Sequence, residues 1–204
     1  MVSRQAAALL KRTKRMVPVV SFVGSSGSGK TTLLERVVRE LKAKGYRVAV
    51  IKHSHHDFDI DQPGKDTWRF AQAGSDVVAI SSPNKIAIIE RVDTELPLEQ
   101  IERLMAGKVD IVLAEGYKNG NTAKIRVLGA EDDGDNLCRQ AETLATISAH
   151  LSPAGVPQFD DDDVARIVNL LIEQIDDKLS CKLGDVSPAA DLLEAVRELI
   201  TAER

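Results

Sequence analysis

A glycine- and serine-rich loop at residues 24–32 is the part of the sequence whose residue types and spacing point most directly to chemistry. Glycines at this spacing let successive backbone N–H groups curl around a phosphate, and the positive N-terminal end of a following helix attracts the same anion. Lys30 would contact the β- and γ-phosphates of a nucleotide and assist catalysis, and the Thr31 hydroxyl would bind Mg²⁺. The sequence therefore predicts a phosphate-binding loop (P-loop). Together with the threonine that follows it, the loop consists of Gly24, Ser25, Ser26, Gly27, Ser28, Gly29, Lys30, Thr31 and Thr32.

A carboxylate at the end of an apolar run is the best candidate for a second metal-binding group. Glu115 directly follows Val109–Ala114, a run typical of a buried strand. If that strand shares a sheet with the P-loop, Glu115 emerges at the edge where the loop lies, and it would hold a Mg²⁺-bound water or polarise the attacking water. The alternative is a solvated acid at a strand end. Asp110, at the opposite end of the run, is expected to be structural.

Histidines and aspartates are concentrated in one segment after a second predicted strand. Such a set would suit a transition metal, Mg²⁺ or an anionic ligand. The alternative is a polar loop that faces water, although loops at this edge of a sheet often carry function. With the lysine that precedes them, these residues are Lys52, His53, His55, His56, Asp57, Asp59 and Asp61.

The elements that must position these residues alternate between strands and helices. Two strand-like runs flank Ser82-Pro83-Asn84, a tight-turn sequence, and predict a hairpin. The order indicates an α/β fold of the P-loop NTPase type, with a doubly wound, mostly parallel sheet and a β-hairpin, whose ligands bind at the carboxyl ends of the strands. We expect strands at 17–23, 47–52, 76–81, 85–91, 109–114, 123–128 and 144–148, and helices after the P-loop and at 66–73, 98–105, 160–178 and 187–202.

Length and composition favour a single main domain. The chain has 204 residues, of which 43% are hydrophobic and only 3% aromatic. Its core must therefore be built from Val, Ile, Leu and Ala, as is typical of buried parallel strands covered by helices. We expect a basic N-terminal extension at 1–16, a P-loop nucleotide-binding domain at 17–178, and a C-terminal helical extension at 179–204.

The distribution of charge and the spacing of the cysteines limit which binding partners and which cellular compartment we expect. The net charge is −4, and residues 1–16 contain basic residues but no acid, so the remainder is more acidic than the whole. That balance argues against nucleic-acid binding. No run approaches the ~18 apolar residues of a membrane span, so no membrane association is expected. Cys138 and Cys181 lack a Cys-x-x-Cys spacing, which suits free thiols in a reducing cytoplasm.

Four elements, taken in order, resemble the MobB family of molybdopterin-guanine dinucleotide biosynthesis adaptors. They are the P-loop, Ile51–Asp57, Pro63–Thr67 and Leu113–Lys118, within a match that covers about residues 17–175. The resemblance implies a homodimer that binds GTP, hydrolyses it slowly, and assists MobA, the guanylyltransferase that joins GMP to molybdopterin. Molybdopterin would be a bound ligand or the substrate of that partner. At the matching positions, Lys65 and Lys118 join the candidate binding residues.

This sequence departs from the family pattern at one position that bears on the nucleotide base. Family members often carry an aspartate, a candidate for reading guanine, after the last strand, where this chain has Ser148-Ala149-His150. The resemblance therefore supports triphosphate binding more than it supports a preference for guanine.

The first alternative function is a P-loop kinase whose small polar substrate is held by the histidine segment. The second is a metallochaperone-type GTPase whose histidines deliver a metal.

Overall fold

The structure, a computed structural model, describes residues 17–129, 142–148, 156–160 and 162–184. The predicted basic extension and the helix predicted at 187–202 lie outside the described residues. The chain divides into two compact units, of which the smaller is Ser54–Pro97 and the larger contains the residues before and after it. The domain boundaries drawn from the sequence remain predictions. In the described part of the chain, no helix is both long and apolar enough to span a membrane.

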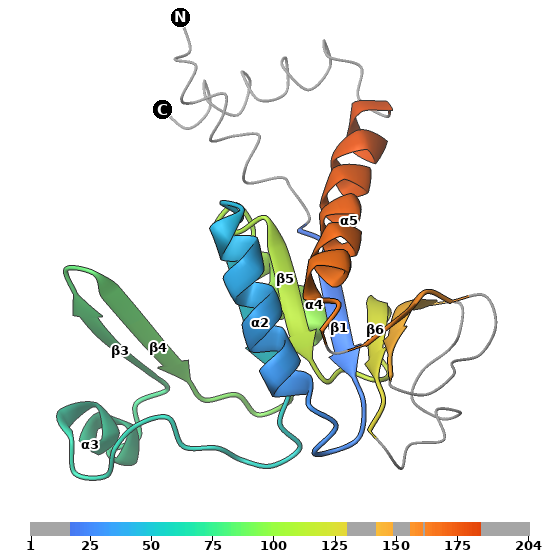
Figure 1. Cartoon of the computed structure of the whole chain (residues 1–204). Helices are drawn as coiled ribbons and strands as arrows, with labels where there is room; N and C mark the ends of the chain where they lie inside the picture. The colour runs from blue at the N-terminus through green and yellow to red at the C-terminus, as the bar shows by residue number, and fades with distance from the viewer. Residues whose placement is uncertain (1–16, 130–141, 149–155, 161, 185–204) are drawn as a thin grey trace, which may run out of the picture. The chain divides into compact units, whose positions relative to one another are not determined.

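The larger unit is organised around a parallel sheet. Its described strands form a six-stranded sheet in the order β2-β5-β1-β6-β7-β8, and every neighbouring pair is parallel. The P-loop strand β1 lies at the centre, between β5 and β6 (Figure 1). This order confirms the predicted P-loop NTPase-type sheet. The strands are β1 (Val19–Val23), β2 (Val48–Lys52), β5 (Ile111–Glu115), β6 (Ala123–Val127), β7 (Thr143–Ile147) and β8 (Gln158–Phe159).

Helices cover both faces of this sheet, as a doubly wound fold requires. Helices α2 (Lys30–Ala43) and α5 (Val164–Gly184) lie side by side on one face (Figure 1). Their core cluster includes Phe22 of β1 and Leu113 of β5. Helix α4 (Leu98–Met105) packs with Val19 and other residues on the opposite face. Aliphatic side chains dominate both clusters, so the expectation of a core poor in aromatics is confirmed.

Apart from shifts of one or two residues at the ends of elements, the structure departs from the sequence-based elements at two places. Strand β8 was not predicted, because a two-residue strand after Pro157 carries too little periodicity to be recognised. Helix α5 begins at Val164 and continues to Gly184, beyond the predicted end at 178. The register between β6 and β7 also shifts between Lys124 and Ile125, which places Leu144 in an irregular position.

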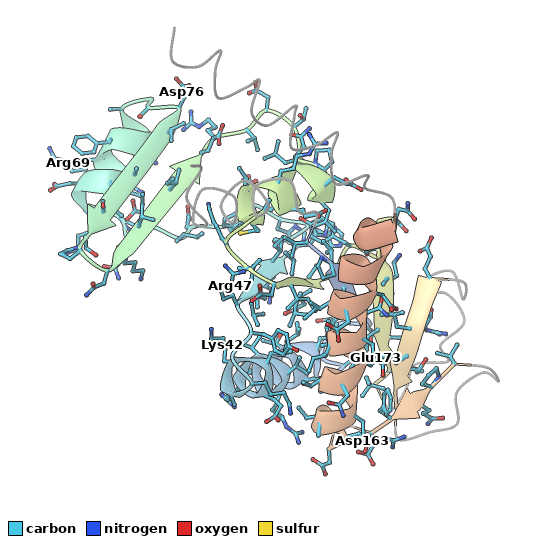
Figure 2. The ribbon with its side chains drawn as sticks, turned by 90° about the horizontal axis from the view of Figure 1, so that it is seen from above. Lys42, Arg47, Arg69, Asp76, Asp163 and Glu173 are labelled. Atoms are coloured by element: carbon cyan, nitrogen blue, oxygen red, sulfur yellow. The ribbon has the colours of Figure 1, made fainter. Side chains whose placement is uncertain are left out.

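The smaller unit contains helix α3 (Asp66–Gln72) and the predicted antiparallel hairpin. Its strands are β3 (Val77–Ser82) and β4 (Lys85–Glu90), paired from Val77 opposite Glu90 to Ser82 opposite Lys85. Arg69 and Asp76, labelled in Figure 2, belong to this unit. The unit therefore consists of a two-stranded ribbon and one short helix.

An ion pair ties the start of β2 to the start of β5. Asp110 Oδ2 accepts hydrogen bonds from the backbone N–H of Arg47 at 2.8 Å and from its Nε at 3.0 Å, while Oδ1 accepts from Nη2. Hydrogen bonding to this carboxylate raises the pKa of Arg47 above its ordinary value. Arg47, labelled in Figure 2, directly precedes β2, so it lies at the end of the parallel sheet away from the P-loop, which follows the carboxyl end of β1. The geometry agrees with a structural role for Asp110.

We expect Asp110→Ala to lower the free energy of unfolding by about 1–2 kcal/mol, because it removes charge-assisted hydrogen bonds that partial exposure weakens. Denaturant unfolding would measure the change. The matched control is Asp162→Ala, since the carboxylate of Asp162 pairs with Arg36 at 3.0 Å but is 92% exposed. The control should change stability by less than about 0.5 kcal/mol. Equal losses in both variants would contradict the structural assignment of Asp110.

Candidate functional site

The P-loop connects β1 to α2, and its first glycine is fixed by close packing. A side-chain carbon on Gly24 would lie 2.2 Å from the carbonyl oxygen of Val127 at the end of β6. No other amino acid fits there unless the backbone moves. Gly27 and Gly29 adopt left-handed backbone conformations, and the carbonyl of Gly29 accepts the first helical hydrogen bond of α2 from Leu33. The helix N-terminus therefore opens onto the loop, as anion binding requires.

Lys30 holds its ammonium group over the loop. Its Nζ donates to the carbonyl oxygen of Gly24 at 3.2 Å, to the hydroxyl of Ser28 at 3.2 Å and to the carbonyl oxygen of Ser25. The side chain is half-buried. A positive charge in the centre of a loop rich in backbone N–H groups is complementary to a phosphate. The arrangement agrees with the role predicted for Lys30, which remains a prediction.

Glu115 lies next to the P-loop helix. Its Oε2 accepts a hydrogen bond from Thr31 Oγ1 at 3.1 Å, and its Oε1 lies 3.4 Å from Lys52 Nζ. The Glu115 side chain is 14% exposed, whereas that of Lys52 is 66% exposed. The sheet register explains why Glu115 and Lys52 lie close together, because β5 pairs with both β1 and β2 and places Glu115 opposite Phe22 and Lys52. The hydroxyl and carboxylate supply hard oxygen ligands of the kind that Mg²⁺ prefers, so these residues fit the predicted metal.

His53 packs against Tyr117 at the same edge of the sheet. The ring centroids are 4.7 Å apart and the ring planes are inclined by 37°. The backbone N–H of His53 donates to the carbonyl of Glu115 at 2.9 Å. Tyr117 has a φ of 55°, which is uncommon outside glycine. Sequence reasoning did not select Tyr117 as a site residue, and the only signal was its place two residues after Glu115.

The remaining predicted binding residues outside the P-loop lie exposed in one or the other of the two units. Three residues of the histidine segment and a lysine lie exposed in the smaller unit: His55, His56, Asp57 and Lys65. Lys118 is exposed in the larger unit, three residues beyond Glu115. Among the described residues, no three His, Cys, Asp or Glu side chains cluster closely enough to hold a metal ion. The segment is therefore not arranged as a preformed metal centre.

Comparison with known proteins identifies the family. A family model described as MobB, molybdopterin guanine dinucleotide synthesis protein B, matches residues 19–149, which include the P-loop and Glu115. The chain belongs to the MobB family. The resemblance found in the sequence is thereby confirmed.

Individual relatives support the MobB assignment over most of the chain. A molybdopterin-guanine dinucleotide biosynthesis adapter protein of Escherichia coli (strain K12) is 33% identical over 165 residues, which are 78% of this chain and 94% of that protein. The crystal structure of Bacillus subtilis MobB matches with a TM-score of 0.65 at 30% identity and covers 77% of this chain and 97% of that one. A crystal structure of molybdopterin-guanine biosynthesis protein B matches with a TM-score of 0.63 at 30% identity, covering 77% and 98%.

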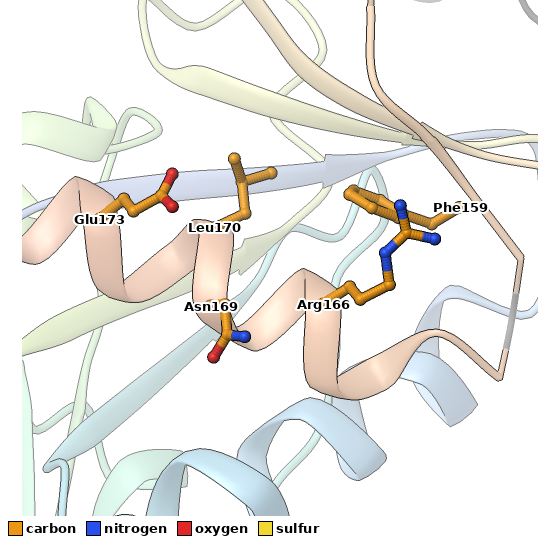
Figure 3. Close-up of a pocket in the computed structure, with 5 residues that line it drawn as sticks. All are labelled: Phe159, Arg166, Asn169, Leu170 and Glu173. Carbon is orange, nitrogen blue, oxygen red and sulfur yellow. The ribbon is translucent and has the colours of Figure 1, made fainter.

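A separate hollow lies beside α5, outside the MobB-typical motifs. It is lined by α5 residues and by Phe159 of β8, over whose ring the Arg166 guanidinium lies at 4.8 Å (Figure 3). Arg166 also pairs with Asp163 at 3.2 Å. The contact of Arg166 with Phe159 joins the short edge strand to the helix. The hollow contains none of the predicted site residues.

We expect Gly24→Ala to abolish nucleotide binding, because the added carbon would displace the loop from the carbonyl of Val127. Calorimetric titration with MgGTP would measure the loss, and circular dichroism would check the fold. The matched control is Gly120→Ala, since its added carbon would meet the nearest heavy atom, the carbonyl oxygen of Tyr117, at 3.4 Å. The control should bind like the unmodified protein. Wild-type affinity in Gly24→Ala would contradict the described packing.

Proposed function

We propose that this protein is a cytoplasmic GTP-binding adaptor that assists guanylyl transfer to molybdopterin, with weak GTPase activity of its own. The single observation that carries the proposal is a P-loop whose Thr31 contacts a strand-end carboxylate, Glu115, in a chain of the MobB family. The Escherichia coli relative is described as a biosynthesis adapter protein, and the match to it covers 78% of this chain. The partner would be the guanylyltransferase MobA.

The described side chains suit binding better than fast turnover. Lys30 would neutralise the β- and γ-phosphates, while Thr31 and Glu115 would hold Mg²⁺, which would shield the charge of the triphosphate. Glu115 is engaged by Thr31 and Lys52 and is therefore poorly placed to accept a proton from water. Unaided hydrolysis should therefore be several orders of magnitude slower than the typical enzyme rate of ~10 per second. The exposed Lys118 and the histidine segment would be available to bind the anionic pterin or its carrier.

The direct test is reconstituted cofactor synthesis from a guanylyltransferase, molybdopterin and MgGTP, with and without this protein. We expect the protein to raise the yield of the guanine dinucleotide cofactor. Lys30→Ala should weaken GTP binding by about 2–3 kcal/mol, the value of a lost charge-assisted contact, and should abolish the gain. Glu115→Gln keeps the shape of the side chain, so it should retain GTP while Mg²⁺-dependent hydrolysis falls.

Two outcomes would overturn the adaptor proposal. One is no stimulation at saturating GTP, and the other is equal stimulation by the Lys30 variant. Phosphoryl transfer to a small polar acceptor would then favour the kinase alternative. Tight transition-metal binding that is lost when the three histidines are replaced would favour the metallochaperone alternative.

The proposal includes a homodimer formed through the hairpin of the smaller unit. One face of the hairpin carries Val77, Ile86 and Ile88, which are 50%, 64% and 62% exposed. Three large apolar side chains on one face of a two-stranded ribbon form a patch that is costly to leave in water. The ribbon also has free backbone groups along its edges, which a second copy would pair.

We expect Ile88→Glu to reduce the mass measured by light scattering from dimer to monomer at micromolar concentration, because burial of the carboxylate in an apolar interface is unfavourable. The matched control is Leu104→Glu on α4, an apolar side chain that is 58% exposed and lies outside the hairpin. The control should remain a dimer. If the unmodified protein were a monomer, the proposed assembly would be excluded. If the Ile88 variant remained a dimer, the dimer interface would have to lie outside the hairpin.

A further inference from the structure

A row of buried polar side chains lies on the sheet face opposite to α2 and α5. Side chains alternate along a strand, and Ile125 and Val127 of β6 point into the core under those helices, so Lys124 and Arg126 point to the other face. Thr146 lies between two core residues of β7 in the same way. Lys124 and Thr146 are fully buried and Arg126 is 5% exposed. Buried charges of this kind require compensation.

Lys124 is fully compensated by its surroundings. Its ammonium group contacts the carboxylate of Glu142 at 2.5 Å and donates to the carbonyl oxygens of Gly120 at 2.5 Å and Thr122 at 3.1 Å. Three acceptors satisfy the three N–H groups of the ammonium. The fold thus supplies a complete set of partners for the first of the two buried cations.

Arg126 differs, because one edge of its guanidinium has no acceptor. Among the residues that the structure describes, no hydrogen-bond partner contacts Nε or Nη2 of Arg126, or Oγ1 of Thr146. Nε and Nη2 form the side of the guanidinium that donates two parallel hydrogen bonds to a carboxylate or phosphate. Thr146 is the register partner of Arg126 on the neighbouring strand, so its hydroxyl lies on the same face. Three donor positions are therefore grouped and unsatisfied.

We propose that Arg126 and Thr146 form a binding site for an oxyanion, the phosphate or carboxylate group of a small-molecule ligand. A buried cation without a counter-charge is strongly destabilising, and buried polar groups in native proteins are almost always paired. An oxyanion would satisfy the free edge of the guanidinium and supply a negative charge that no ion pair with a described residue provides. A guanine edge also offers two acceptors to an arginine, but it is neutral and would leave the charge uncompensated.

The site is distinct from the P-loop, although the two are neighbours in the sheet. Arg126 pairs with Val23, the residue that precedes Gly24, but the P-loop helix α2 covers the opposite face. Arg126 is one residue from the carboxyl end of β6, the edge at which ligands enter sheets of this class. The inference does not depend on the proposed function, because it can be tested in a variant whose P-loop lysine is removed.

The test is thermal unfolding of Lys30→Ala during titration with inorganic phosphate, at ionic strength held constant with sodium chloride. The Lys30 substitution suppresses anion binding at the P-loop. We expect a saturable rise in melting temperature, because a ligand that binds only the folded state stabilises it. Adding Arg126→Met should remove this rise. It should not lower the melting temperature measured without phosphate, because it removes an uncompensated buried charge.

Arg126→Lys provides a second variant, because it keeps the charge but loses the two-donor edge. It should weaken the apparent affinity for phosphate, obtained from the titration of the melting temperature, about tenfold or more. Acetate and guanosine are titrated in parallel, so that a carboxylate, a phosphate and a neutral base are distinguished. A response to guanosine alone, no response to either anion, or a phosphate response that survives in both Arg126 variants would overturn the proposal.

Discussion

The close approach of Gly24 to the carbonyl of Val127 is the contact on which the rest of the site depends. It places the first residue of the P-loop directly against β6, with no side chain between them. The pairing of β1 with β6 therefore determines where the loop starts, and the loop in turn determines where α2 begins. Lys30, the first residue of that helix, then has its ammonium group over the loop, where the carbonyl oxygen of Gly24 accepts a hydrogen bond from it.

The other side of β1 positions the carboxylate in the same way. The backbone N–H of Gly116 donates to Phe22 at 3.0 Å, and the N–H of His53 donates to Glu115. These bonds extend the parallel ladders by one residue past the ends of β5 and β2. Thr31, Glu115 and Lys52 come together because three adjacent parallel strands end at one edge, which is the general reason why such sheets bind ligands there.

The sequence predicted the parts of the molecule that have strong local patterns. The loop spacing and the apolar runs around 17–23 and 109–114 were enough to place Glu115 near the P-loop. The pairing of Lys52 with Glu115 depends on the strand order, which no local pattern contains. The left-handed Tyr117 depends on its packing with His53. The alternation of Lys124, Ile125 and Arg126 is typical of a half-exposed strand, yet the fold buries all three, so their environment became visible only in three dimensions.

The ion pair between Lys52 and Glu115 gives the site an internal competitor for cations. Because Lys52 is attached to the adjacent strand, its ammonium group is present at a high effective concentration near the carboxylate. If Glu115 binds Mg²⁺ as proposed, a free divalent ion would have to displace this ammonium group, and the exposed lysine would lose its partner. An ion that arrived with a triphosphate would bring new anionic partners for the displaced ammonium group. On the proposed function, the ion pair would therefore couple the binding of the metal to that of the nucleotide, so that each would favour the other.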